Sequence, residues 1–80
     1  MTKEDVLIQI QDIFKLVLKK VDVALTEHST FGDVAGWDSL NHMIIMSEIE
    51  KHFKIKFNFR EVLKLKNIGD VCNAVLAKIE

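Results

Sequence analysis

Ser39 is the residue of this chain whose surroundings most suggest chemistry. It is the fourth residue of the run Gly36-Trp37-Asp38-Ser39-Leu40. Glycine can adopt the positive φ angles that often end a loop, aspartate is a preferred helix N-cap, and an apolar-periodic segment follows at once. Taken alone, such a serine is most often only part of a helix start. The pattern nevertheless places its hydroxyl in the first turn of a helix, beside a loop.

A hydrolytic nucleophile is one interpretation of this serine. Ser39 and His42 lie one helical turn apart, and the motif is similar to the G-D-S-L signature of one hydrolase class. Those hydrolases need a strand-to-helix turn, a distant histidine held by a carboxylate, and an oxyanion hole built on a much larger sheet. A helical chain of 80 residues offers no rigid place for that assembly. A small esterase is therefore the least favoured function.

Metal and nucleotide sites are not predicted either. Three histidines and one cysteine show neither C-x-x-C nor H-x-x-x-H spacing: His28, His42, His52 and Cys72. The three glycines are far apart and form no Walker or dinucleotide pattern.

Charge and composition narrow the function classes further. Eleven Lys and Arg residues face twelve Asp and Glu residues, so the formal net charge of -1 provides no field that would attract nucleic acid or an anionic membrane. The single cysteine excludes an internal disulfide, and the N-terminus lacks the basic region and long apolar run of a signal peptide. We expect one domain over residues 1–80, forming a cytoplasmic monomer that neither binds nucleic acid nor inserts into a membrane.

Hydrophobic periodicity predicts a helix from about residue 3 to about residue 19. Thr2 and Asp5 form a T-x-x-D start, and apolar residues follow at spacings of three and four: Val6, Ile10, Ile13, Phe14, Val17 and Val21. Residues 21–37 lose this period and indicate a long loop, with one short turn near residues 22–25. Phe31 and Val34 are expected to hold this loop against the bundle.

A second helix is expected to start at Asp38 and to run to about Phe53. One arc of it is apolar and predicts the core face: Met43, Ile45, Met46, Ile49 and Phe53. The opposite arc is expected to face solvent and to offer a docking stripe for a partner: Leu40, Asn41, Ile44, Ser47, Glu48 and Lys51. Packing within this chain does not require the two branched apolar residues of that stripe, Leu40 and Ile44.

The last third of the chain predicts one short and one longer helix. Residues 54–59 alternate polar with apolar, but a lone strand leaves its ladder groups unpaired, so we expect an extended connector. Asn58 with Glu61 predicts a short third helix of about two turns, and Asn67 with Asp70 predicts a fourth that reaches the C-terminus. Cys72 lies on the apolar stripe of that helix, as a buried small hydrophobe.

The order and lengths of these elements resemble an acyl carrier protein or a related peptidyl carrier domain over essentially all 80 residues. The matching runs are Gly36-Trp37-Asp38-Ser39-Leu40 and Ile49-Glu50-Lys51-His52-Phe53. This resemblance implies an all-α four-helix bundle, with three longer helices and one short one, which does not catalyse.

It also implies a role for Ser39, flanked by Asp38 and Leu40. A separate phosphopantetheinyl transferase would attach the 4'-phosphopantetheine arm of coenzyme A to this serine, using Mg²⁺. The thiol of the arm would then carry an acyl or aminoacyl thioester between loading enzymes and downstream biosynthetic enzymes.

The second helix departs from the strongly acidic pattern of fatty-acid carriers. After its first turn it reads Asn41, His42, Met43, Ile44, Ile45, Met46 and Ser47, and lysines follow at 51, 54 and 56. The pathways that remain are fatty-acid-like, polyketide, nonribosomal peptide or cell-surface polysaccharide pathways. The departure favours a dedicated pathway of this kind over general fatty-acid synthesis, and Trp37 before the Asp-Ser pair points the same way. A helical interaction module that binds a partner through its stripe, without a prosthetic group, is the alternative.

Overall fold

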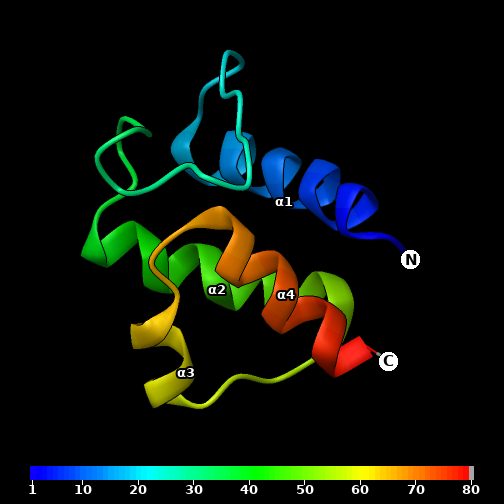
Figure 1. Ribbon diagram of the computed structural model, residues 1–80. Coiled ribbons are helices and arrows are strands. Elements are labelled where there is room, and N and C mark those ends of the chain that lie inside the picture. The colour runs from blue at the N-terminus through cyan, green and yellow to red at the C-terminus, as the bar shows by residue number, and fades with distance from the viewer. Residues whose placement is uncertain (80) are drawn as a thin grey trace.

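The computed structural model describes residues 1–79, which form four helices. They are α1 (Lys3–Leu18), α2 (Ser39–Phe53), α3 (Phe59–Lys64) and α4 (Ile68–Ile79). Figure 1 shows α1 lying across the bundle from α2 and α4, with the short α3 at the far end of the molecule from α1. The predicted fold class, three longer helices and one short helix, is confirmed.

Polar side chains start the helices at the expected places. Thr2 and Asp5 form a reciprocal capping box, with the Asp5 amide 3.1 Å from Thr2 Oγ1 and the Thr2 amide 3.0 Å from Asp5 Oδ2. Asn58 and Glu61 form a second capping box at α3. The Asp70 amide donates to Asn67 Oδ1 over 2.8 Å at the start of α4. Each of these bonds satisfies an amide that a helix start leaves without a partner.

One apolar core joins the three longer helices. Its fully buried members come from all of them: Val6, Ile10, Phe14, Ile45, Met46, Ile49, Ile68, Val71, Cys72 and Val75. Burial raises the pKa of the Cys72 thiol, so this residue is the inert small hydrophobe that its position predicted.

The long loop between α1 and α2 is pinned to this core, but its turns are elsewhere than predicted. Val34 is buried and Phe31 packs against the core, as expected. No turn forms at residues 22–25; the turns lie at residues 27–28 and 31–36. Val21 is 91% exposed, although its spacing had placed it with the apolar residues of α1. The helix ends before it, because Lys19 takes a left-handed conformation with φ of 56°.

The predicted core face of α2 is confirmed at three positions and wrong at one. Ile45, Met46 and Ile49 are buried as predicted, and Phe53 is half-buried. Met43 is 40% exposed, and His42 is buried in its place.

The other elements agree with the sequence. Residues 54–58 form no strand, and the isolated bridge between Thr30 and Asn67 is the β pairing present within residues 1–79. None of the four helices has the length and apolar content that crossing a bilayer would require.

Candidate functional site

Ser39 is the first residue of α2, and its side chain is exposed at the surface. Asp38 caps the helix: its Oδ1 accepts the Asn41 amide over 2.8 Å. The Asn41 side chain reaches back and donates to the Gly36 carbonyl oxygen over 2.7 Å. Gly36 has φ of 90°, which other residues rarely adopt, so this turn depends on its glycine. These two bonds fix the backbone turn that presents Ser39.

The start of α2 favours a negative group at Ser39. The first amides of a helix and its dipole attract anions, with a typical contribution of about 0.3–1 kcal/mol. The Asp38 carboxylate at the N-cap already accepts one of these amides, but the first turn of α2 itself contains no further acidic side chain.

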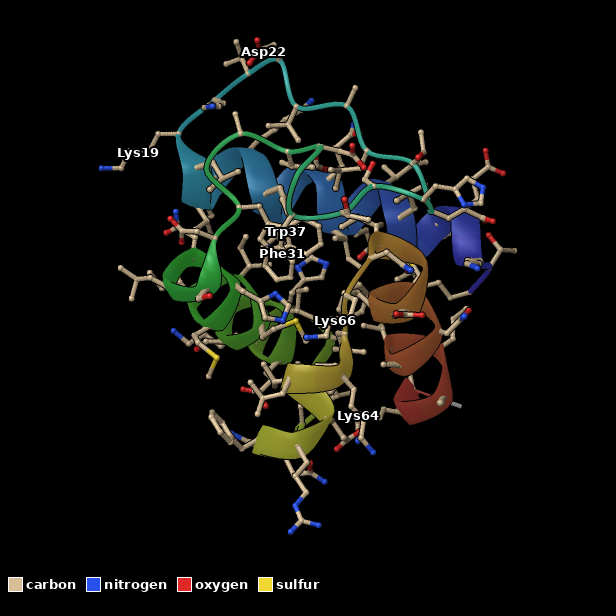
Figure 2. All side chains as sticks on the ribbon, turned by 60° about the vertical axis from the view of Figure 1, so that its left-hand side comes forward. Lys19, Asp22, Phe31, Trp37, Lys64 and Lys66 are labelled. Carbon is tan, nitrogen blue, oxygen red and sulfur yellow. The ribbon has the colours of Figure 1, made fainter. Side chains whose placement is uncertain are left out.

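The residue before the cap, Trp37, is a core residue. It is 2% exposed, its ring stacks on Phe31 at 4.4 Å between centroids, and it meets the edge of Phe14 at 5.1 Å. Figure 2 shows Phe31 and Trp37 lying together beneath the loop. Sequence reasoning took Trp37 as a mark of the pathway; its contacts give it a structural role, which is to anchor the chain just ahead of Ser39.

His42 is the site residue whose burial was not predicted from the sequence. Trp37 Nε1–H donates to His42 Nδ1 over 3.1 Å, and His42 Nε2 lies 3.1 Å from the carbonyl oxygen of Val62 in α3. The available signal was its spacing, because His42, Ile45, Met46 and Ile49 recur at i, i+3, i+4 and i+7. The polar side chain had hidden this pattern.

A cleft of about 130 Å³ opens between α2 and α3 beside the serine. Residues of both helices and of the two flanking segments line it: Phe31, Ser39, His42, Met43, Val62, Leu63, Leu65 and Lys66. This volume is well below the roughly 300–1,000 Å³ of typical small-molecule sites. The cleft is therefore too small to hold a cofactor by shape alone, and a group used here would need a covalent bond.

The predicted docking stripe lies on the surface of α2. Leu40 is 72% exposed and Ile44 is 43% exposed. Ser47 and Lys51 are exposed as well, whereas Asn41 and Glu48 are half-buried. Lys51 pairs with Glu48 over 3.5 Å, so this end of the stripe has little free charge.

The structure extends this surface beyond α2. Leu63 of α3 is 52% exposed, and it lines the same cleft as the exposed Met43. Apolar side chains of two helices thus flank the opening beside Ser39. Sequence reasoning assigned Met43 to the core and did not place α3 next to the serine.

No catalytic or metal constellation accompanies the serine. Over residues 1–79, no three His, Cys, Asp or Glu side chains gather as metal ligands would. Both ring nitrogens of His42 are bonded to Trp37 and Val62, so the imidazole is not in a position to act as a base on Ser39. The arrangement offers an exposed hydroxyl at a helix start, and none of the neighbouring side chains described above is placed to activate it.

Known proteins match the part of the chain that contains this site. Residues 9–75 match a protein family described as "Phosphopantetheine attachment site". An acyl carrier protein of Exiguobacterium sibiricum is 30% identical over 79 residues, which cover 99% of this chain and 100% of that protein. An acyl carrier protein of another Exiguobacterium strain is 32% identical over the same length.

A solved structure is also similar. The solution NMR structure of a holo acyl carrier protein from Geobacter metallireducens has a TM-score of 0.85 and 38% sequence identity, and the match covers 92% of this chain and 85% of that one. The range of residues matched by the family includes the Ser39 turn, the cleft and the outer face of α2.

Proposed function

This chain belongs to the acyl carrier protein family of phosphopantetheine-binding, non-catalytic carriers, and on that premise we propose that Ser39 bears the 4'-phosphopantetheine arm. The observation that supports this choice is the exposed Ser39 hydroxyl at the start of α2. The chain has two other serines. Ser29 is buried and accepts the Thr26 amide over 2.9 Å, and Ser47 lies inside α2, away from its positive end.

The attachment reaction needs only a few features from the carrier. Ser39 Oγ forms a bond to the phosphorus of the arm as the adenosine bisphosphate part of coenzyme A leaves, and the hydroxyl proton passes to solvent or to the transferase. The transferase and its Mg²⁺ supply the chemistry of this step. The carrier supplies an exposed hydroxyl, a turn fixed by Asp38 and Asn41, and a helix start that favours the new phosphodiester.

Intact-mass spectrometry tests this function. Incubation with coenzyme A, Mg²⁺ and a broad-specificity phosphopantetheinyl transferase should add the mass of one arm to the chain. A chain that gains no mass with several active transferases, each of which modifies a known carrier in a parallel reaction, would favour an interaction module without a prosthetic group.

We further propose that the arm serves a dedicated polyketide, nonribosomal peptide or cell-surface polysaccharide pathway. The reason is the outer face of α2, where Leu40 and Ile44 stand in place of the carboxylates typical of general fatty-acid carriers. The loading enzyme of that pathway would dock on the stripe Leu40, Asn41, Ile44, Ser47, Glu48 and Lys51. We expect this to take place in the cytoplasm.

Ile44→Glu should slow loading by the cognate enzyme at least about tenfold. Full burial of a branched side chain contributes on the order of 1.5–3 kcal/mol, of which the part of Ile44 that is still exposed can supply about half or less. A glutamate at the same contact adds the cost of burying a carboxylate without a partner, and together the two effects should exceed the roughly 1.4 kcal/mol that corresponds to one decade in rate. The fold should be unchanged, since the Ile44 side chain is 43% exposed. Loading kinetics of the holo protein, measured by the appearance of the thioester mass, give the result.

Ile8→Glu is the matched control for this substitution. Ile8 is 56% exposed and lies on α1, so it undergoes the same chemical change away from Ser39. It should load like the parent. Raising the salt concentration should also slow the parent less than Ile44→Glu does, because the chain is nearly neutral and salt screens exposed charges beyond about 8–10 Å. An unimpaired Ile44→Glu variant would place recognition on another surface.

A further inference from the structure

His42 joins three separate pieces of the site. It is 5% exposed, and neither of its partners belongs to its own helix: Trp37 lies in the loop before Ser39 and Val62 lies in α3. The Phe31 ring also meets the imidazole edge at 5.2 Å between centroids. The ring of His42 is therefore a direct link between α2, the loop and α3 at the cleft beside Ser39.

The two partners fix the proton of His42. The Trp37 indole Nε1–H can only donate, so the Nδ1 atom that receives it carries no proton. The Val62 carbonyl oxygen can only accept, so Nε2 carries the proton of the neutral ring. These two contacts are compatible with one tautomer, the neutral Nε2–H form.

Protonation of Nδ1 would break one of these links. It would set an N–H of the imidazolium against the indole N–H of Trp37, where two donors cannot bond. None of the residues that line the cleft is a carboxylate that would offset the new charge. The loop presents the rings of Phe31 and Trp37, and α3 presents Val62 and Leu63. The segment after α3 presents Lys66, the cationic side chain of this lining. Figure 2 shows Lys66 next to α3 on the side of the molecule that faces the viewer.

Helix α3 keeps its link, because the Nε2–H of a protonated His42 still donates to the Val62 carbonyl oxygen. It has six residues, and a helix this short is not stable by itself in water. Its other ties to the bundle are the buried Val62 side chain at its end and an ion pair of 3.0 Å between Glu61 and Lys78 of α4.

We propose that neutral His42 is a positioning residue for the attachment site, and that protonation of its Nδ1 releases the Trp37 loop from α2 and so loosens the turn before Ser39, while α3 stays bonded to the ring. The assignment of the arm to Ser39 is the proposed function on which this inference rests. The link itself can be measured in the unmodified chain, so the two can fail independently.

The direction of the pH effect follows from the surroundings of the ring. Burial lowers the pKa of His42 below the ordinary histidine value of about 6.5. The Val62 carbonyl opposes this with a smaller effect, and the positive charge of Lys66 lowers the pKa by less still. The unfolded chain therefore binds this proton first as the pH falls. The contribution of His42 to the free energy of unfolding has its full value above about pH 6.5. It decreases below that pH until the folded protein also takes up the proton.

Nuclear magnetic resonance of the unmodified protein tests the proposal. At about pH 7.5 the ¹⁵N shifts of the His42 ring should report the neutral Nε2–H tautomer. On acidification, the Trp37 indole N–H should exchange with solvent at least about tenfold faster, once intrinsic exchange is corrected, with the same midpoint as the His42 ring. The amides of α3 should show no acceleration at that midpoint, because the Val62 carbonyl keeps its bond to the ring.

Two variants separate a specific link from general acid loosening. His42→Gln keeps one acceptor and one donor but does not titrate, so the acid-induced exchange should disappear. Trp37→Phe keeps an aromatic ring but removes the donor, so the His42 ring should titrate at a higher pH than in the parent. The proposal is overturned if His42 titrates without any change at Trp37, or if a folded Trp37→Phe leaves the midpoint unchanged. The second variant decides the matter should His42→Gln fail to fold.

Discussion

Ser39→Ala should abolish the gain of one phosphopantetheine mass when the chain is incubated with coenzyme A, Mg²⁺ and a transferase. The substitution removes the only atom of residue 39 that can bond to phosphorus. Neither other serine offers a substitute, because Ser29 is buried and hydrogen-bonded and Ser47 lies inside α2. Intact-mass spectrometry should therefore find the variant unmodified under conditions in which the parent is converted completely.

The loss must come from chemistry and not from unfolding. Ser39 is exposed and the α2 cap is made by Asp38, so alanine at position 39 should change the free energy of unfolding by no more than about 0.5 kcal/mol. A thermal melt of the variant checks this. Ser47→Ala is the matched control on the same helix and should accept the arm like the parent. Modification that persists in Ser39→Ala would move the attachment site to another residue.

The helix starts could be predicted because their signals are local. A side chain that satisfies its own helix's first amides acts within three residues, so T-x-x-D at Thr2 and N-x-x-E at Asn58 needed no knowledge of the fold. The same applies to Asp38, whose bond to the Asn41 amide fixes the position of Ser39. The candidate attachment site was accessible from sequence for this reason.

Two predictions, for Val21 and for residues 22–25, were wrong because local sequence pattern does not determine the path of the chain after a helix. Val21 has the spacing of an α1 residue, but Lys19 turns left-handed at φ of 56° and sends the chain away from the helix axis. The predicted helix end at about residue 19 agrees with this cap, but a lysine stands where a left-handed cap usually has glycine, so the spacing of Val21 alone assigned it to the apolar face of the helix. The expected turn at residues 22–25 failed together with it, since that segment follows the new direction of the chain.

The burial of His42 in place of Met43 has a different cause. The helical period alone places His42 in the middle of the buried arc of α2 and Met43 at its edge. The predicted core face did not include the histidine. A buried imidazole needs partners, and these come from Trp37 and from the Val62 carbonyl of α3. The contact to α3 is a tertiary one, so sequence could indicate the phase of His42 but not its partners.

Phe14→Ala should be the most destabilising single truncation on α1. The Phe14 side chain is completely buried, and its ring meets Trp37 at 5.1 Å with an angle of 79° between the planes. Removal of a buried phenylalanine costs on the order of 3–5 kcal/mol, because the apolar contacts are lost and a cavity remains. A chain of this size is stable by roughly 4–12 kcal/mol in total. The variant should therefore melt at least about 12 °C below the parent.

Two further truncations make this a test of position in the core and not of side-chain size alone. Leu16 lies two residues along the same helix and is 70% exposed, so Leu16→Ala should change stability by no more than about 0.5 kcal/mol. Phe53 is half-buried, so Phe53→Ala should cost less than Phe14→Ala although the same atoms are removed. Because Trp37 is the only tryptophan, its fluorescence should also shift in Phe14→Ala before global unfolding and remain unchanged in Leu16→Ala. Equal losses for Phe14 and Phe53, or a Phe14→Ala melt within a few degrees of the parent, would show that α1 does not anchor the Trp37 loop and hence does not support the turn that presents Ser39.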